Sequence, residues 1–185
     1  MTFRGFVAVD IPPTPALAEF VSQLRNASSS LRVVSTDHLH LTLKFLGETE
    51  EGLVPEILTA IREASRGIRS FEIRVRGTGA FPSAARMNVI WVGVDGAEPL
   101  ARIAAGLDAS LETLGFARET RPWKPHLTVA RVKGRRDLDR VQRIVAAHGD
   151  TVFATHRLDS IHLKRSFLTP SGALYSVVES ARLGE

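Results

Sequence analysis

The stretch His40-Leu41-Thr42-Leu43 recurs as His126-Leu127-Thr128-Val129, 86 positions later (126 minus 40). Each copy lies in a run in which apolar and polar residues alternate, and this alternation predicts a β-strand. Residues two apart on a strand point to the same face, so each strand would present one imidazole and one hydroxyl side by side. The repeat therefore predicts two similar strands that together form a two-histidine site.

The offset of 86 positions also aligns the segments around the motif. A short strand pattern and a helix pattern precede each copy, and a helix pattern and an alternating strand pattern follow it. In chain order these segments are 6–10, 15–28, 54–64 and 71–75 in the first copy, and 89–94, 98–114, 138–147 and 152–163 in the second. The sequence therefore contains two copies of one repeat unit, over residues of about 1–78 and 86–180.

Glycine and proline mark the predicted joints of the chain. Gly77, Gly79, Pro82 and Ser83 predict a polar, flexible connection between the two copies, and Pro170-Ser171-Gly172 predicts a turn between the last two strands. Since no long linker separates the copies, we expect a single α+β domain over residues 1–185. It would have two pseudo-symmetric lobes, each an antiparallel sheet with helices on its outer face, enclosing a central cleft with one histidine on each wall.

Composition sets mild limits on the class of protein. The chain has 185 residues, of which 44% are hydrophobic, and it has no cysteine, which excludes disulfides and thiolate metal sites. The N-terminal apolar run is too short for a signal peptide, and no stretch approaches the about 20 apolar residues of a membrane span. We therefore expect a cytoplasmic monomer that has no membrane partner.

Positive charge is concentrated around the second histidine. The net charge is +4, but residues 116–143 alone hold nine Lys or Arg against three Asp or Glu, a local balance of +6. Such a patch would attract phosphate-rich ligands and make binding depend on salt. The alternative is a solvated helix face. Four of the arginines share one predicted helical segment with two aspartates. These arginines are Arg135, Arg136, Arg140 and Arg143.

The motifs and their flanks resemble the RNA 2′,3′-cyclic phosphodiesterases of the 2H phosphoesterase superfamily, also called the 2′-5′ RNA ligase-like family. The resemblance runs nearly end to end. It rests on the motif copies and on the segments around them, chiefly 6–10, 38–47, 79–82, 121–131 and 168–175. One His-x-Thr alone would be a weak match, whereas two copies in register within these flanks are specific.

This resemblance implies hydrolysis of 2′,3′-cyclic phosphate ends of RNA or oligonucleotides to 2′-phosphomonoesters, with no metal or other cofactor. Opening the cyclic diester needs a base to deprotonate water and an acid to protonate the departing ribose oxygen. The family implies that His40 is the acid toward O3′ and His126 the base, roles that spacing alone cannot assign. Thr42, Thr128 and a nearby guanidinium would stabilise the charge on the non-bridging oxygens.

Two basic residues are candidates for binding the phosphate or for lining the cleft. Arg131 has the family position of an arginine that contacts phosphate, but strict alternation would point it away from Thr128, so this role requires a bulge or a strand end. Lys44 shares the face of His40 by period two, yet its counterpart Ala130 is not basic. We therefore rank Arg131 ahead of Lys44.

His38 is a further candidate for the cleft, since it shares the face of His40. His-x-His on a strand is a metal-ligand spacing, and His126 could add a third ligand to make a zinc site. We expect no metal, because no carboxylate or cysteine pattern supports one and the threonines would have no role.

Aromatic residues could stack a nucleobase. Phe81, Trp123 and Tyr175 are candidates for lining the cleft, whereas Phe45 is out of phase with His40 and is expected in the core. Two other functions also stay open. A relative that joins or cleaves 2′-5′ linkages would use the same site, and a noncatalytic RNA-binding protein would need the basic patch but not the paired motifs.

Overall fold

The computed structural model describes residues 1–169 and 172–184, and Pro170 and Ser171 of the predicted turn lie outside them. The first series of elements is β1 (Thr2–Asp10), α1 (Pro15–Ala27), β2 (Leu31–Val33), the 3-10 helix η1 (Thr36–His38), β3 (His40–Glu50), the 3-10 helix η2 (Glu51–Leu53), α2 (Val54–Ala64) and β4 (Phe71–Ser83). The second is β5 (Arg86–Asp95), α3 (Glu98–Glu112), β6 (His126–Val132), α4 (Leu138–Ala147) and β7 (Val152–Leu158), followed by β8 (Ser160–Thr169) and β9 (Gly172–Arg182).

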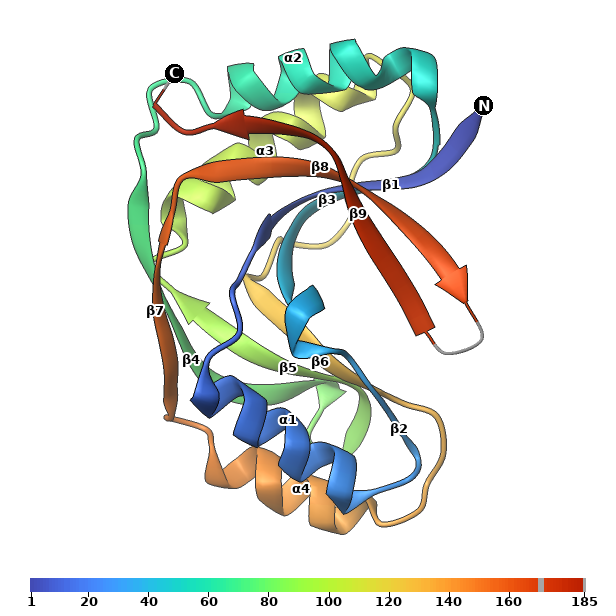
Figure 1. Ribbon diagram of the computed structural model, residues 1–185, viewed down its shortest axis with the longest axis vertical. Helices are drawn as coiled ribbons and strands as arrows, with labels where there is room; N and C mark the ends of the chain where they lie inside the picture. The colour runs from blue at the N-terminus through green and yellow to red at the C-terminus, as the bar shows by residue number, and fades with distance from the viewer. Residues whose placement is uncertain (170–171, 185) are drawn as a thin grey trace.

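All strands of the described chain belong to one curled antiparallel sheet (Figure 1). Its order is β7-β4-β5-β6-β3-β1-β8-β9, with β2 paired to β6. Helices α1 and α4 pack on the half that contains β4 and β7, and α2 and α3 pack on the half that contains β3, β8 and β9. The predicted α+β class with helices outside two half-sheets is confirmed. Each half-sheet is covered by one helix from each series, because α1 and α3 each pack on the half-sheet that does not contain the strand before them.

The core lies between these helices and the outer face of the sheet. Helix α1 begins at Pro15, where the Thr14 side chain accepts a hydrogen bond from the Leu17 amide, and its buried stripe includes Phe20 and Leu24. Helix α3 buries an equivalent stripe of leucine and isoleucine. The apolar side chains of helices and strands fill this outer layer, whereas the inner face of the sheet holds the motif histidines and threonines together with aromatic rings. None of the helices in the described residues is long and apolar enough to cross a membrane.

The predicted flexible connection between the two copies is wrong, because it forms the end of β4. Residues 78–83 remain paired with β5 as far as Ser83, which lies opposite Arg86. Gly79 serves close packing rather than flexibility: a Cβ there would collide with the Trp91 ring on β5. The chain therefore passes from one copy to the other through a tight hairpin.

A β-bulge interrupts β3 immediately after its motif threonine. Ala8 of β1 lies opposite Thr42, and Val7 lies opposite Lys44, so Leu43 is the extra residue. An extra residue reverses the alternation of side chains beyond it. Lys44 consequently points to the outer face of the sheet, away from the motif side chains.

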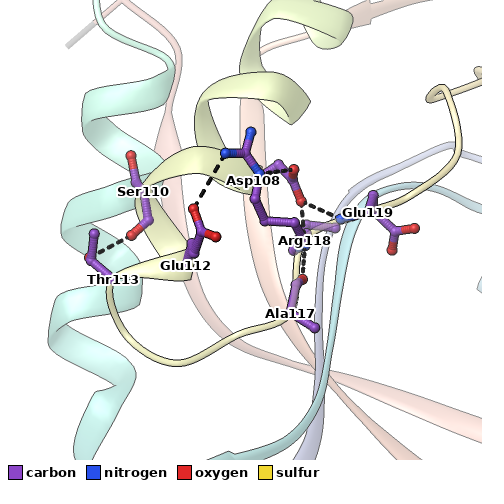
Figure 2. A network of polar contacts seen from close by, with 8 residues as sticks. Asp108, Ser110, Glu112, Thr113, Ala117, Arg118 and Glu119 are labelled. Carbon is purple, nitrogen blue, oxygen red and sulfur yellow. Dashed lines mark hydrogen bonds and ion pairs between the residues drawn. The ribbon is translucent and has the colours of Figure 1, made fainter.

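The expectation that Lys44 lines the cleft is therefore wrong. The side chain is buried, with 2% exposure, and its Nζ donates hydrogen bonds of 2.5 Å to Asp108 Oδ1 and to the main-chain oxygen of Ala117. Figure 2 shows the Asp108 carboxylate also held by Arg118 and by the Glu119 amide. Burial acts to raise the pKa of Asp108, but these hydrogen bonds outweigh it and hold the pKa below its usual value.

Strand β6 has a bulge at the equivalent position. Trp91 of β5 lies opposite Thr128, and Ile90 lies opposite Ala130, so Val129 is the extra residue. The reversed alternation returns Arg131 to the face of Thr128, which is the condition that its proposed contact with phosphate requires.

The same reversal on β3 corrects the expectation for Phe45. Phe45 comes directly after Lys44 and points to the inner face. It is 60% exposed, and its ring centroid lies 6.3 Å from that of Phe6. Phe45 is therefore not part of the core, because the bulge at Leu43 places it on the same face as His40.

Candidate active site

The two motif strands meet at the centre of the curled sheet. Leu41 and Leu127 are the one pair of residues that joins β3 and β6 in the described chain, and both are fully buried beneath the helices. The antiparallel register on either side of this pair brings His40 toward Thr128, and Thr42 toward His126, on the inner face. Each half-sheet thus supplies one His-x-Thr pair to a single site.

Both imidazoles are fixed by the same main-chain contact. His40 Nδ1 lies 2.8 Å from the carbonyl oxygen of His38, and His126 Nδ1 lies 2.7 Å from that of Lys124. Because a carbonyl oxygen only accepts hydrogen bonds, Nδ1 is the donor in each ring. Within the described residues each Nε2 has no hydrogen-bond partner, so it can contact a ligand.

Aromatic side chains surround His40. Its ring centroid lies 4.9 Å from that of Tyr175 in an edge-on arrangement and 5.0 Å from that of Phe6. Tyr175 also packs edge-on against His38, at 5.8 Å, which places His38 at this side of the site on η1 rather than on the motif strand. Burial lowers the pKa of His40.

An ion pair beside His40, formed by a buried lysine and a half-exposed aspartate, also acts on its pKa. Lys164 of β8, 5% exposed, pairs with Asp10 of β1, which lies opposite His40 in the sheet. After burial, the largest effect is the His38 carbonyl, which raises the pKa of His40; Lys164 then lowers it and Asp10 raises it. Sequence reasoning missed this pair, because only the pairing of β1 with both β3 and β8 brings the two residues together.

The surroundings of His126 come from other elements. Its ring centroid lies 5.1 Å from that of Phe81, edge-on, and Phe81 in turn packs against Trp91 at 5.4 Å. Trp123 lies in the loop before β6, and its Nε1 donates a 3.0 Å hydrogen bond to the main-chain oxygen of Thr42. Phe81 thus contacts the second histidine, and Trp123 ties the second copy to the first motif strand.

Arg131 lies near the aromatic group around His40. Burial raises the pKa of Tyr175, and the positive charges of Arg131 and Arg4 partly offset this effect, so both guanidinium groups lie within electrostatic reach of the phenol. Neither arginine has a carboxylate within 4 Å among the described residues. Both are therefore available to an anionic ligand.

The zinc alternative finds no support in the described residues. They contain no group of three histidine, aspartate or glutamate side chains placed to hold a metal ion. His38 lies on η1, so the strand alternation behind the His-x-His reading does not apply to it.

Residues 12–166 match the family model of the 2′-5′ RNA ligase superfamily. The chain belongs to this superfamily. A superfamily protein of Methanothermobacter thermautotrophicus, named RNA 2′,3′-cyclic phosphodiesterase, is 36% identical over 187 aligned residues, covering 99% of this chain and 100% of the relative. A protein of the same name from Aeropyrum pernix is 36% identical and covers 88% and 92% of the two chains.

The fold of a solved relative agrees with these matches. The crystal structure of TT0787 of Thermus thermophilus superimposes with a TM-score of 0.80 at 31% identity, covering 97% of each chain. The family resemblance read from the sequence is thus confirmed by sequence and by structure.

Proposed function

We propose that this protein hydrolyses 2′,3′-cyclic phosphate ends of RNA or oligonucleotides to 2′-phosphomonoesters. The observation that supports this proposal most strongly is the matched pair of histidines on adjacent strands, each with Nδ1 bonded to a carbonyl and Nε2 left for chemistry. The relatives named RNA 2′,3′-cyclic phosphodiesterase support the choice of substrate.

In this mechanism the two histidines act from opposite sides of the phosphorus. His126 Nε2 takes a proton from water, the water oxygen bonds to phosphorus, and the P–O3′ bond breaks in line with it. His40 Nε2 gives its proton to O3′, which leaves a 3′-hydroxyl and a 2′-phosphate. The assignment of acid and base follows the family resemblance.

The threonines and Arg131 serve the charge that develops on the non-bridging oxygens. Within the described residues, the hydroxyls of Thr42 and Thr128 have no hydrogen-bond partner, so both can donate to phosphate. Arg131 adds a full positive charge on the same face. These donors stabilise the pentacovalent transition state in the absence of a metal ion.

The superfamily's name favours a second candidate, the formation or cleavage of 2′-5′ linkages. A 5′-hydroxyl would take the place of water, and the same histidines would move the same protons. This reaction differs from hydrolysis only in the nucleophile, so it makes no separate demand on the site.

A product assay tests the proposal. The purified protein is incubated in EDTA with an oligonucleotide that ends in a 2′,3′-cyclic phosphate, and the product is identified by phosphorus NMR. We expect a 2′-phosphomonoester at an undiminished rate. A 3′-phosphate product, or activity that EDTA removes and zinc restores, would overturn the mechanism. The His40→Ala/His126→Ala double variant controls for contaminating nucleases.

A further inference from the structure

Strand β2 places a second arginine directly beside Arg131. In the antiparallel pairing of β2 with β6, Arg32 lies opposite Arg131, between the pairs Leu31 with Val132 and Val33 with Ala130. Residues opposite each other in antiparallel strands share one face. The bulge at Val129 sets that face as the inner one, so both guanidinium groups point to the side of the motif threonines.

The protein itself supplies no counter-charge for this pair. Like charges directly opposite each other on a sheet destabilise it, and neither Arg32 nor Arg131 has a carboxylate within 4 Å in the described chain. The neighbour of Arg131 on its other side is Val89, which is apolar. Two other arginines of the sheet, Arg76 and Arg165, differ in that each has an acidic partner.

The position of the pair relates it to the reaction site. Arg131 lies on the face of Thr128 and within electrostatic reach of Tyr175, whose ring packs on His40. Arg32 is one strand further out, at a spacing of about 5 Å, and it is exposed. An anion at Arg32 would therefore lie beside a phosphate held by Arg131, on the side away from β5.

We propose that Arg32 binds the phosphodiester that precedes the terminal cyclic phosphate, with Arg131 between the two phosphates. The inference rests on the proposed function and specifies its substrate as an oligonucleotide end rather than a cyclic mononucleotide. Two bound phosphates would neutralise the Arg32 and Arg131 charges that the protein leaves unpaired.

The test compares adenosine 2′,3′-cyclic phosphate with the dinucleotide ApA that ends in the same group. In Arg32→Gln, we expect the ratio of kcat/KM for the dinucleotide to that for the mononucleotide to fall about 10-fold, the scale of one charged phosphate contact. For the dinucleotide, the negative slope of log kcat/KM against log salt concentration should become shallower by about 1. Arg32→Lys should retain most of the ratio.

Arg102→Gln is the matched control, because Arg102 is an exposed arginine on the outer helix α3 without an acidic partner in the described chain. Its ratio and salt slope should equal those of the wild type. An equal effect of Arg32→Gln on both substrates, or no effect on either, would overturn the inference.

If the proposed function is wrong, the wild-type protein will turn over neither substrate. Binding of the two 2′-phosphate products is measured in parallel by calorimetry, so the role of Arg32 is tested even without turnover. Equal affinity of wild type and Arg32→Gln for the dinucleotide product would contradict the inference independently of catalysis.

Discussion

Strands β3 and β6 repeat one backbone with different side chains. Both begin with histidine, place threonine two residues later and then have a bulge. Beyond the bulge, β3 has Lys44 on the outer face and Phe45 on the inner face, whereas β6 has Ala130 and Arg131. The shared backbone supplies two imidazoles held in the same way, and the differing residues place a cation on the inner face after the bulge of β6 but not after that of β3.

The surroundings of the two histidines differ as well. His40 packs against Phe6 and Tyr175 beside the ion pair of Lys164 with Asp10, and burial lowers its pKa. His126 contacts Phe81 of β4, which belongs to the same half of the sheet as β6. The two imidazoles therefore stand in unequal environments, and the lowered pKa favours the neutral form of His40, so the assignment of His40 as the acid rests on the family resemblance alone.

Removal of either imidazole tests what the two strands share. We expect His40→Ala and His126→Ala each to lower turnover of a 2′,3′-cyclic phosphate by about 10²-fold or more, the scale of a positioned acid or base. Thermal unfolding should be little changed. Near-wild-type turnover in either variant, with folding intact, would exclude the two-histidine mechanism.

Replacement of the residues after the bulges tests where the strands differ. Arg131→Gln removes a charged contact to phosphate worth about 2 kcal/mol, so kcat/KM should fall about 30-fold. The matched variant is Phe45→Leu, which should have a much smaller effect because no charge is lost. Comparable losses in steady-state kinetics would show that the two positions do not differ in the way proposed.

The threonines test the equivalence of the two motifs. Thr42→Val and Thr128→Val keep the branched shape but remove a hydroxyl, so each should lower kcat about 10-fold through weaker transition-state stabilisation. The pH of maximal activity should not move. If the pH–rate profile shifts while the rate at the optimum is kept, the hydroxyls tune the imidazoles instead.

Two buried lysines allow a finer test of the electrostatics around His40. Lys164 lowers the pKa of His40, so Lys164→Met should raise that pKa. An acid must be protonated, and the protonated fraction of His40 falls as pH rises through its pKa. The alkaline limb of kcat/KM should therefore move to higher pH in the variant than in the wild type.

Lys44→Met is the control, because it breaks the similar ion pair with Asp108 on the outer face of the sheet. It should lower the melting temperature but leave the alkaline limb in place. A limb that moves equally in both variants, or moves to lower pH in Lys164→Met, would mean that His40 does not set it.

Sequence alone predicted the features that depend on local pattern. The repeat of His40 and Thr42 at His126 and Thr128 predicted the motif strands, and alternation predicted their shared face. The alternation gave the wrong face for Lys44, because a period of two does not reveal a bulge. The role proposed for Arg131 also depended on a bulge, and this one could be stated only as a requirement.

Features made by distant pairing could not be predicted. Asp10 and Lys164 lie together because β1 pairs with β8, and Arg32 meets Arg131 because β2 joins the edge of β6. No spacing within the sequence encodes these contacts, which arise only once the sheet closes around its inner face.

A substrate with sulfur in place of O3′ tests the division of labour between the two histidines most directly. The thiolate leaves without needing a proton, so this substrate does not require the acid. We predict that His40→Ala regains most of the wild-type rate on it, whereas His126→Ala stays about 10²-fold slower. Rescue of His126→Ala instead would reverse the assignment, and rescue of neither variant would contradict a role for either histidine in protonating the leaving group.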